Sequence, residues 1–405
     1  MKSKIVLLLV ILNIGCNSQN DKKGISAVNL TANSFYTISI PEILKNQREV
    51  PISEIAERIE YVVLETSKES LLGRIFDVKF TKDFIFVQHH NGALAQFDRT
   101  GSFIRYIGRL GRGPEEYNMI RAFSIDEEYG RIYVQSNYVR TIQVYSFDGK
   151  YIETVNFNDD FGFIVWSRDS LFMCFKEPTR GVEEYVFTER NSTGEILQYV
   201  RNNFFWQNDN AMSYIRFNSD INVYYRLNNR LHFKGWHNDT IYTYDSNNKI
   251  VPKFFIDLGK FKLPDELRFE KTGETGSSAQ YYWIGVKEAL RYVFIMYGNY
   301  YEGKNSDQGL IYYDTDEGAG NSLINKNGKI EFVNDLDGGM GFWPEYVNDS
   351  LAFQLIQAKD MKEYLNSEDF IKSTSKYPEQ KEMLINHMKG LKESDNDVLM
   401  VVKLK

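Results

Sequence analysis

One kind of turn recurs along this chain between short runs of alternating apolar and polar residues. In each copy Asp or Asn opens the turn and caps backbone amides, and Gly or Asn follows where the backbone needs a positive φ. The copies are Asp98-Arg99-Thr100-Gly101, Asp148-Gly149, Asn191-Ser192-Thr193-Gly194, Asp245-Ser246-Asn247-Asn248 and Asn325-Lys326-Asn327-Gly328. Gly149 lies 48 residues after Gly101, and Gly194 lies 45 residues after Gly149. A four-stranded blade of a β-propeller, about 40 to 50 residues long, has this repeat length.

Strand-like runs occupy these repeats in groups of four, and each recurrent turn precedes the fourth run of its group. The first group comprises residues 75–81, 84–88, 94–98 and 103–107, and the second comprises residues 120–126, 131–135, 141–147 and 151–157. Further blades are expected at about residues 161–200, 221–257 and 282–333, the last after a polar insertion at 259–280.

The last group is incomplete in a way that predicts how the ring closes. Residues 341–347 and 350–356 supply two strands, residues 398–404 supply a third, and residues 361–391 between them have a helical spacing of apolar side chains. The early strand at residues 59–65 has no neighbour in sequence, so we expect it to be the fourth strand and to remove both free sheet edges. The sequence therefore predicts an all-β fold, a six-bladed β-propeller over residues 52–405. In this fold the N-terminal strand pairs with the C-terminal strand, and the last blade carries a short helical insertion.

A glycine-rich segment joins the first two groups. Its turn-forming residues exclude a regular helix or strand, so we expect an ordered loop that ties one blade to the next. The residues of this interblade motif are Gly108, Gly111, Gly113, Pro114, Glu116 and Tyr117. The glycines lack the Lys-Ser or Lys-Thr pair of a P-loop, and their spacing is not that of a dinucleotide fingerprint.

The N-terminus resembles a bacterial lipoprotein signal. Basic residues precede a short apolar run that ends at Ile14-Gly15-Cys16, so we expect residues 1–16 to be the signal peptide with Cys16 as the lipidated residue. Residues 17–51 are expected to be a flexible tether and lead-in. These features place the protein in the cell envelope, anchored to the outer membrane by lipid, with its periplasmic or surface orientation left open.

The charge balance disfavours nucleic acid as a partner. The formal net charge is −7, and it becomes −9 when Lys2 and Lys4 leave with the signal. After lipidation of Cys16, Cys174 is the one remaining cysteine, so no disulfide within the chain is possible.

With these features in place, the chain resembles the six-bladed β-propeller lipoproteins common in Bacteroidetes-type bacteria, which are similar to NHL-repeat propellers. Ile107 to Tyr117 matches the family's joint, I-G-x-x-G-x-G-P-x-E-Y, throughout. The resemblance implies an exported, lipid-anchored propeller and supplies no catalytic residues.

Two kinds of candidate ligand site follow from the polar and aromatic residues. Trp206, Trp236 and Trp343 are candidates for contact with a glycan, since a flat aromatic side chain beside amides suits a sugar ring. Asp77, Arg216 and Glu345 are expected near the propeller channel, where a divalent metal would need carboxylate ligands. The first interpretation is a binding or scaffolding protein for a glycan or an envelope protein, without a cofactor. The alternative is a metal-dependent hydrolase or lyase of a sugar-derived substrate.

Overall fold

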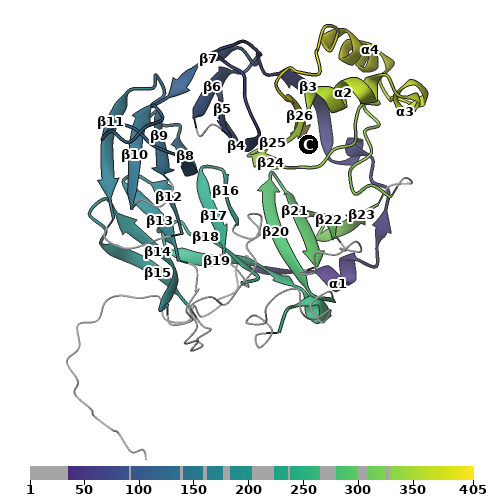
Figure 1. Ribbon diagram of the computed structural model, residues 1–405. Helices are drawn as coiled ribbons and strands as arrows, with labels where there is room; N and C mark the ends of the chain where they lie inside the picture. Colours follow the sequence, from purple (N-terminus) through teal and green to yellow (C-terminus); the bar gives the residue numbers. More distant parts are fainter. Residues whose placement is uncertain are drawn as a thin grey trace, which may run out of the picture.

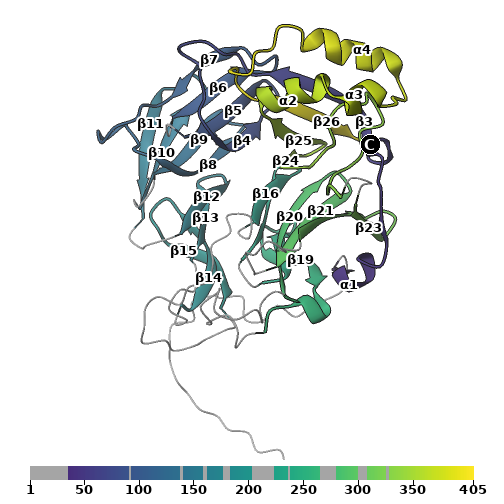
Figure 2. The same ribbon diagram turned by 45° about the vertical axis from the view of Figure 1, so that its right-hand side comes forward.

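The computed structural model describes residues 35–90, 93–136, 140–157, 162–176, 183–202, 223–235, 238–264, 280–299, 308–324 and 328–405. Six sheets are arranged like blades around a central axis, which confirms the predicted six-bladed β-propeller (Figures 1 and 2). Within the described ranges, no helix has both the length and the apolar character needed to cross a membrane.

The first three blades are four-stranded antiparallel meanders, as the repeated turns predict. Blade 1 contains β4 (Ile75–Phe80), β5 (Phe84–His89), β6 (Leu94–Asp98) and β7 (Phe103–Ile107). Blade 2 contains β8 (Ile120–Asp126), β9 (Arg131–Ser136), β10 (Thr141–Ser146) and β11 (Tyr151–Asn156). Blade 3 contains β12 (Phe163–Arg168), β13 (Leu171–Phe175), β14 (Tyr185–Asn191) and β15 (Ile196–Arg201).

Blades 4 and 5 each have the expected four antiparallel strands and one more. Blade 4 contains β16 (Val223–Leu227), β17 (Arg230–Lys234), β18 (Thr240–Tyr244) and β19 (Ile250–Asp257), followed by the short helix η2 (Gly259–Phe261). Blade 5 contains β20 (Tyr282–Ala289), β21 (Tyr292–Asn299), β22 (Gln308–Asp314) and β23 (Ala319–Leu323). The additional strand in each sheet comes from the N-terminal part of the chain.

The last turn of blade 5 lies earlier than the sequence pattern predicts. Its fourth strand, β23, ends at Leu323 and therefore precedes the turn-like sequence at residues 325–328, so the prediction that a fourth strand follows this sequence was wrong. The true hairpin turn follows Asp314, whose side-chain Oδ1 accepts a hydrogen bond from the amide of Asp316 at 3.0 Å. Gly318 supplies the positive φ of this turn. Residues 325–327 lie outside the described ranges.

Residues 36–51, which we call the outer strap, run along the outer edges of blades 4 and 5 (purple in Figure 1). Strand β1 (Tyr36–Ser39) pairs in parallel with β19, and strand β2 (Gln47–Arg48) pairs in parallel with β23. Helix α1 (Ile40–Ile43) connects the two strands, and the short helix η1 (Ile52–Glu54) follows the strap. Ile38 and Ile40 are fully buried. Residues 36–51, expected as part of the lead-in, therefore belong to the propeller.

Blade 6 is built from both ends of the described chain, as predicted. It contains β24 (Tyr346–Asn348), β25 (Leu351–Ile356), β26 (Val398–Leu404) and β3 (Ala56–Val63). Strand β26 pairs antiparallel with β3, from Val398 opposite Val63 to Leu404 opposite Ala56. The N-terminal strand therefore closes the ring against the C-terminal strand.

The helical insertion lies between β25 and β26, close to its predicted bounds. It contains α2 (Ala358–Leu365), α3 (Glu368–Lys372) and α4 (Pro378–His387), which lie together beside β26 and β3 (Figure 2). Met361, Phe370 and Leu384 are buried in the hydrophobic core that blades 5 and 6 share. The insertion is thus outside the strand ladder but inside the core.

The glycine-rich joint forms an ordered loop between blades 1 and 2. Tyr117 is buried at its end, where its hydroxyl donates to the carbonyl of Ile107 at 2.5 Å and accepts from the amide of Leu94 at 3.1 Å. Gly108 has a φ of 66°, and a Cβ there would lie 2.8 Å from the rings of Tyr117 and Tyr145. The close approach of these rings explains the need for glycine at this position.

The rest of the joint is fixed by Glu116. Its side-chain Oε2 accepts a hydrogen bond from the amide of Gly113 at 2.9 Å, and a Cβ on Gly111 would lie 1.8 Å from that same oxygen. Tyr145 of blade 2 donates to the carbonyl of Glu115 at 2.8 Å. These contacts join the loop to both blades.

Candidate binding site

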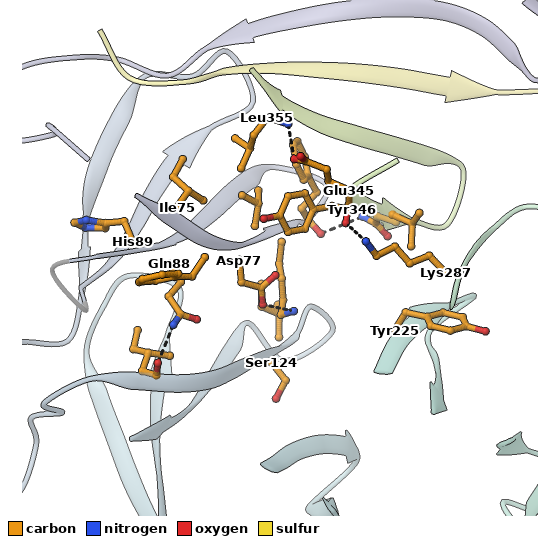
Figure 3. A pocket seen from close by; sticks show the side chains of 18 of the residues that line it. Ile75, Asp77, Gln88, His89, Ser124, Tyr225, Lys287, Glu345, Tyr346 and Leu355 are labelled. Carbon is orange, nitrogen blue, oxygen red and sulfur yellow. Dashed lines mark hydrogen bonds and ion pairs between the residues drawn. The ribbon is translucent and has the colours of Figure 1, made fainter. Parts of the chain in front are cut away.

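A cavity of about 1540 Å³ occupies the centre of the propeller. The inner strand of every blade contributes to its wall: β4, β8, β12, β16, β20 and β24. Figure 3 shows side chains from these strands, among them Asp77, Ser124, Tyr225, Lys287 and Tyr346, with Glu345 directly before β24. The cavity is therefore the axial channel of the propeller, where side chains from six separate segments of the chain meet.

A lysine of blade 1 reaches across the channel. Lys79 Nζ lies 2.8 Å from the carboxylate of Asp77 on the same strand, and it lies 5.5 Å from the ring centroid of Tyr224 on blade 4. Burial acts to lower the pKa of Lys79, but the Asp77 carboxylate and its neighbours outweigh burial, so the pKa is raised above its ordinary value. Lys79 is therefore a charged lysine in the channel, and the predicted site residue Asp77 is its ion-pair partner.

Arg226 uses its donors to join blade 4 to blade 3. Its Nη2 donates to the carbonyls of Trp166 at 2.8 Å and Ser167 at 2.7 Å, and its guanidinium lies 4.1 Å from the Trp166 ring centroid. Burial lowers the pKa of Arg226 to about 10, so the side chain is still charged at neutral pH. The hydrogen bonds to the carbonyls give this residue a structural role.

The predicted residues Glu345 and Trp343 line the channel on blade 6. The side-chain Oε2 of Glu345 accepts a hydrogen bond from the amide of Leu355 at 2.9 Å. Its backbone carbonyl accepts one from the ammonium group of Lys287 on blade 5 (Figure 3). Trp343 is half-buried, which leaves part of its ring open to the cavity.

Two β-bulges place further side chains at one end of the channel. In blade 1 the pairing shifts between Ile75 and Asp77, and in blade 2 it shifts between Ile120 and Ala122. The residue between each pair is Phe76 or Arg121, at equivalent positions of the two inner strands. A bulge redirects the side chain of its extra residue. Alternation along a strand cannot reveal such a shift, so neither residue was expected at the site.

Phe76 and Arg121 are both open for contact with a ligand. The side chain of Phe76 is 48% exposed, and the guanidinium of Arg74 lies 5.6 Å from its ring centroid. The guanidinium of Arg121 lies 4.6 Å from the ring centroid of Phe163 on blade 3. Its Nε is buried, and within the described part of the chain it has no hydrogen-bond partner. Nor does Arg121 form an ion pair with a described residue.

Other predicted site residues lie outside the described ranges. They are Cys16, Trp206, Arg216 and Trp236. The structure thus brings together Asp77, Trp343 and Glu345 at the channel, and it adds Phe76, Arg121 and Phe163.

The described residues of the channel do not fit a metal centre. Across the described ranges, no three side chains of His, Cys, Asp or Glu lie close enough together to hold an ion. Asp77 is paired with Lys79, and Glu345 is bonded to the backbone of blade 6.

Two solved bacterial structures are similar to this chain. The chain is similar to a putative exported protein of Bacteroides fragilis, with a TM-score of 0.67 and 16% identity over 92% of this chain and 100% of that one. It is also similar to a member of the DUF4221 family from Bacteroides vulgatus, with a TM-score of 0.46 and 12% identity over 87% and 98% of the two chains.

No match to this sequence was found among curated proteins. One family model, however, matches residues 35–403, which include the outer strap and all six blades. The chain therefore belongs to the family described as a domain of unknown function, DUF4934.

Proposed function

We propose that this protein is an exported, lipid-anchored binding protein of the cell envelope that holds a glycan, or a segment of an envelope protein, in its central channel. The observation that carries this proposal is the cavity of about 1540 Å³ with walls from all six blades. Its lining combines aromatic side chains with many polar and charged groups, which can fix the orientation of a polar ligand.

The proposal of export and anchoring rests on two supports. The N-terminal sequence resembles a lipoprotein signal ending at Cys16, and the fold is similar to that of a putative exported protein. A lipid attached to Cys16 would hold the propeller at the outer membrane, since acyl chains supply membrane affinity through their buried methylene groups.

The anchor is tested with Cys16→Ser. We expect wild-type protein in the membrane fraction and the variant in the soluble fraction after cell lysis. Metabolic labelling with an alkyne fatty acid should mark the wild type alone. A variant that stays in the detergent phase would contradict lipidation at Cys16.

A binding role accounts for the channel better than metal-dependent chemistry does. The predicted hydrolase or lyase needs carboxylates that are free to hold a metal, whereas Asp77 and Glu345 already have partners in the fold. The ring of Phe76 lines the cavity beside Arg74 and His90 and keeps an exposed face that a ligand could contact.

The binding function is tested with a glycan array and with crosslinking in intact cells. Phe76→Ala removes an exposed aromatic face from the channel, and Ile152→Ala is the matched control on outer strand β11, where the side chain is 41% exposed. We expect Phe76→Ala to weaken binding by about 10-fold, as loss of an aromatic ligand contact commonly does. We expect Ile152→Ala to bind like the wild type. If both variants bind equally well, the ligand does not occupy the channel.

A further inference from the structure

We propose that Arg121 forms an oxyanion subsite in the channel and that the ligand is an acidic saccharide whose carboxylate or sulfate group binds there. This inference rests on the proposed binding function and names the ligand class. It follows from three observations: how Arg121 is held, what the other channel cations do, and which side chains surround the subsite.

Among the described residues, no carboxylate forms an ion pair with Arg121, and two other features hold the side chain in place. The bulge between Ile120 and Ala122 directs it into the channel, and the ring of Phe163 supports the guanidinium at 4.6 Å. Its Nε is buried and, among the described residues, unsatisfied. A buried donor without an acceptor costs about 1 to 3 kcal/mol, so such a group is rare unless a ligand completes it. A guanidinium fork matches the two oxygens of a carboxylate or sulfate.

Most of the other cations that line the cavity are engaged within the fold, and Lys359 is one of them because it pairs with Glu363. Arg74 is exposed and lies against the ring of Phe76. Lys79 pairs with Asp77, Arg226 donates to the carbonyls of blade 3, and Lys287 donates to the carbonyl of Glu345. The whole chain has a net charge of −7, so its general electrostatic field does not attract anions. Arg121, which pairs with no carboxylate in the described part of the chain, therefore points to a local site for an anion.

The surroundings of Arg121 favour a saccharide over a small inorganic anion. Phe76, Phe163 and Trp343 present aromatic faces along the cavity, and Ser124 and Gln88 add polar groups. A pyranose ring has an apolar face that packs on an aromatic ring and hydroxyls at its edge that form hydrogen bonds. The cavity of about 1540 Å³ exceeds the roughly 300 to 1,000 Å³ of a typical small-molecule pocket. There is room for an oligosaccharide.

The test compares three trisaccharides on one sugar backbone: trigalacturonate, its neutral carboxyl-reduced form, and the sulfated neutral form. Calorimetry with purified protein measures affinity for the wild type, Arg121→Gln and Arg121→Lys. The control variant is Arg112→Gln, which removes the same charge from an exposed position in the glycine-rich joint, away from the cavity lining. Thermal unfolding of each variant shows whether it folds.

We expect the wild type to prefer a charged trisaccharide over the neutral one. Arg121→Gln should lower affinity for the charged form by about 10- to 100-fold and leave the neutral form unchanged. Arg121→Lys should retain part of the preference, and Arg112→Gln should retain all of it. Preference for the carboxylated or the sulfated form identifies which oxyanion the subsite takes.

Two other outcomes would overturn the inference and can be told apart. If the wild type binds charged and neutral forms equally and Arg121→Gln has no effect, the oxyanion subsite is wrong and the channel-binding function stands. If none of the three binds, both the subsite and the glycan part of the proposed function are wrong. If Arg121→Gln does not fold, Arg121→Lys decides: a preference for the charged form that is weaker than that of the wild type supports a role for the guanidinium fork. An unchanged preference contradicts it.

Discussion

Tyr61 lies directly opposite Met400 in the ladder between β3 and β26, and this pairing joins the two ends of the propeller. Tyr61 also packs against the core that blades 5 and 6 share. Closure therefore depends on strand β26, because its removal leaves β3 without a partner strand and exposes one edge of β25.

Truncation after Asn396 is expected to cause aggregation. It removes β26 and uncovers Phe353, which is buried and stacked on Phe80 with ring centroids 3.7 Å apart. Exposed strand edges and apolar side chains drive association. Gel filtration should show large species, whereas truncation after Leu404 should give a monomer-sized peak like the full chain. A trimmed, monodisperse protein ending at Asn396 would contradict the closure.

The outer strap is expected to contribute to stability. Ile38→Ala removes a fully buried side chain between β1 and blade 4 and should lower the free energy of unfolding by about 2 to 5 kcal/mol. Thr37→Ala, next to it on the exposed side of β1, should change it by less than about 0.5 kcal/mol. Urea unfolding measures both. Equal effects of the two variants would mean that the strap does not pack as described.

Glycine at position 108 is required for packing, which a paired substitution can show. Gly108→Ala meets both a φ of 66° and the rings of Tyr117 and Tyr145 at 2.8 Å. Gly194→Ala meets a φ of 85° with no atom within 4 Å. The strained backbone alone should lower the free energy of unfolding of Gly194→Ala by about 1 to 2 kcal/mol. The steric clash in Gly108→Ala should lower it by about 1 to 3 kcal/mol more. Similar losses in thermal unfolding would refute the close approach.

The helical insertion is expected to be part of the core, although it lies outside the strand ladder. Phe370 is 3% exposed and its neighbour Ile371 is 69% exposed. Phe370→Ala should lower the free energy of unfolding by about 3 to 5 kcal/mol, and Ile371→Ala should leave it almost unchanged. Differential scanning calorimetry gives both values. If the two variants unfold at the same temperature, the insertion is only loosely attached.

Asp397 is expected to make stability depend on pH. Burial, with a contribution from Asp360, raises the pKa of Asp397 to about 6 from 3.8. Between these values the folded state binds more protons than the unfolded chain, so stability is fully present below about pH 4 and falls as the pH rises through about 6.

The variant Asp397→Asn should remove the loss of stability that accompanies the rise in pH. It should be more stable than the wild type by about 1 kcal/mol at pH 8, a value reduced by solvent because the side chain is only partly buried. At pH 4 the two proteins should unfold at nearly the same temperature. A constant difference at both values of pH would show that Asp397 does not titrate in this way.

The repeated turns predict the blades well because each turn acts locally. An Asp or Asn cap and a residue with positive φ fix a hairpin without help from distant segments, as at Asp98 and Gly101. The closure by residues 59–65 follows from the count of strands. In blade 5, residues 325–328 resemble the same turn but follow the last strand, and Asp314 opens the turn that the fold uses.

The parts that sequence reasoning missed depend on distant contacts. Strand β1 is only four residues long and pairs in parallel with β19, so no hairpin turn connects the two strands and no turn motif predicts the pairing. At the site, Asp77, Trp343 and Glu345 were expected from residue type and strand position. Arg121 was missed because a bulge changes the direction of its side chain, and the bulge depends on the partner strand β9.

The most direct test of the channel as a binding site is a crystal structure with the acidic trisaccharide that binds best. We predict density for the sugar in the central cavity, with its carboxylate or sulfate within hydrogen-bond distance of Arg121 and a ring against Phe76 or Phe163. Density for the sugar on the outer surface of the blades, with the channel free of it, would contradict the account.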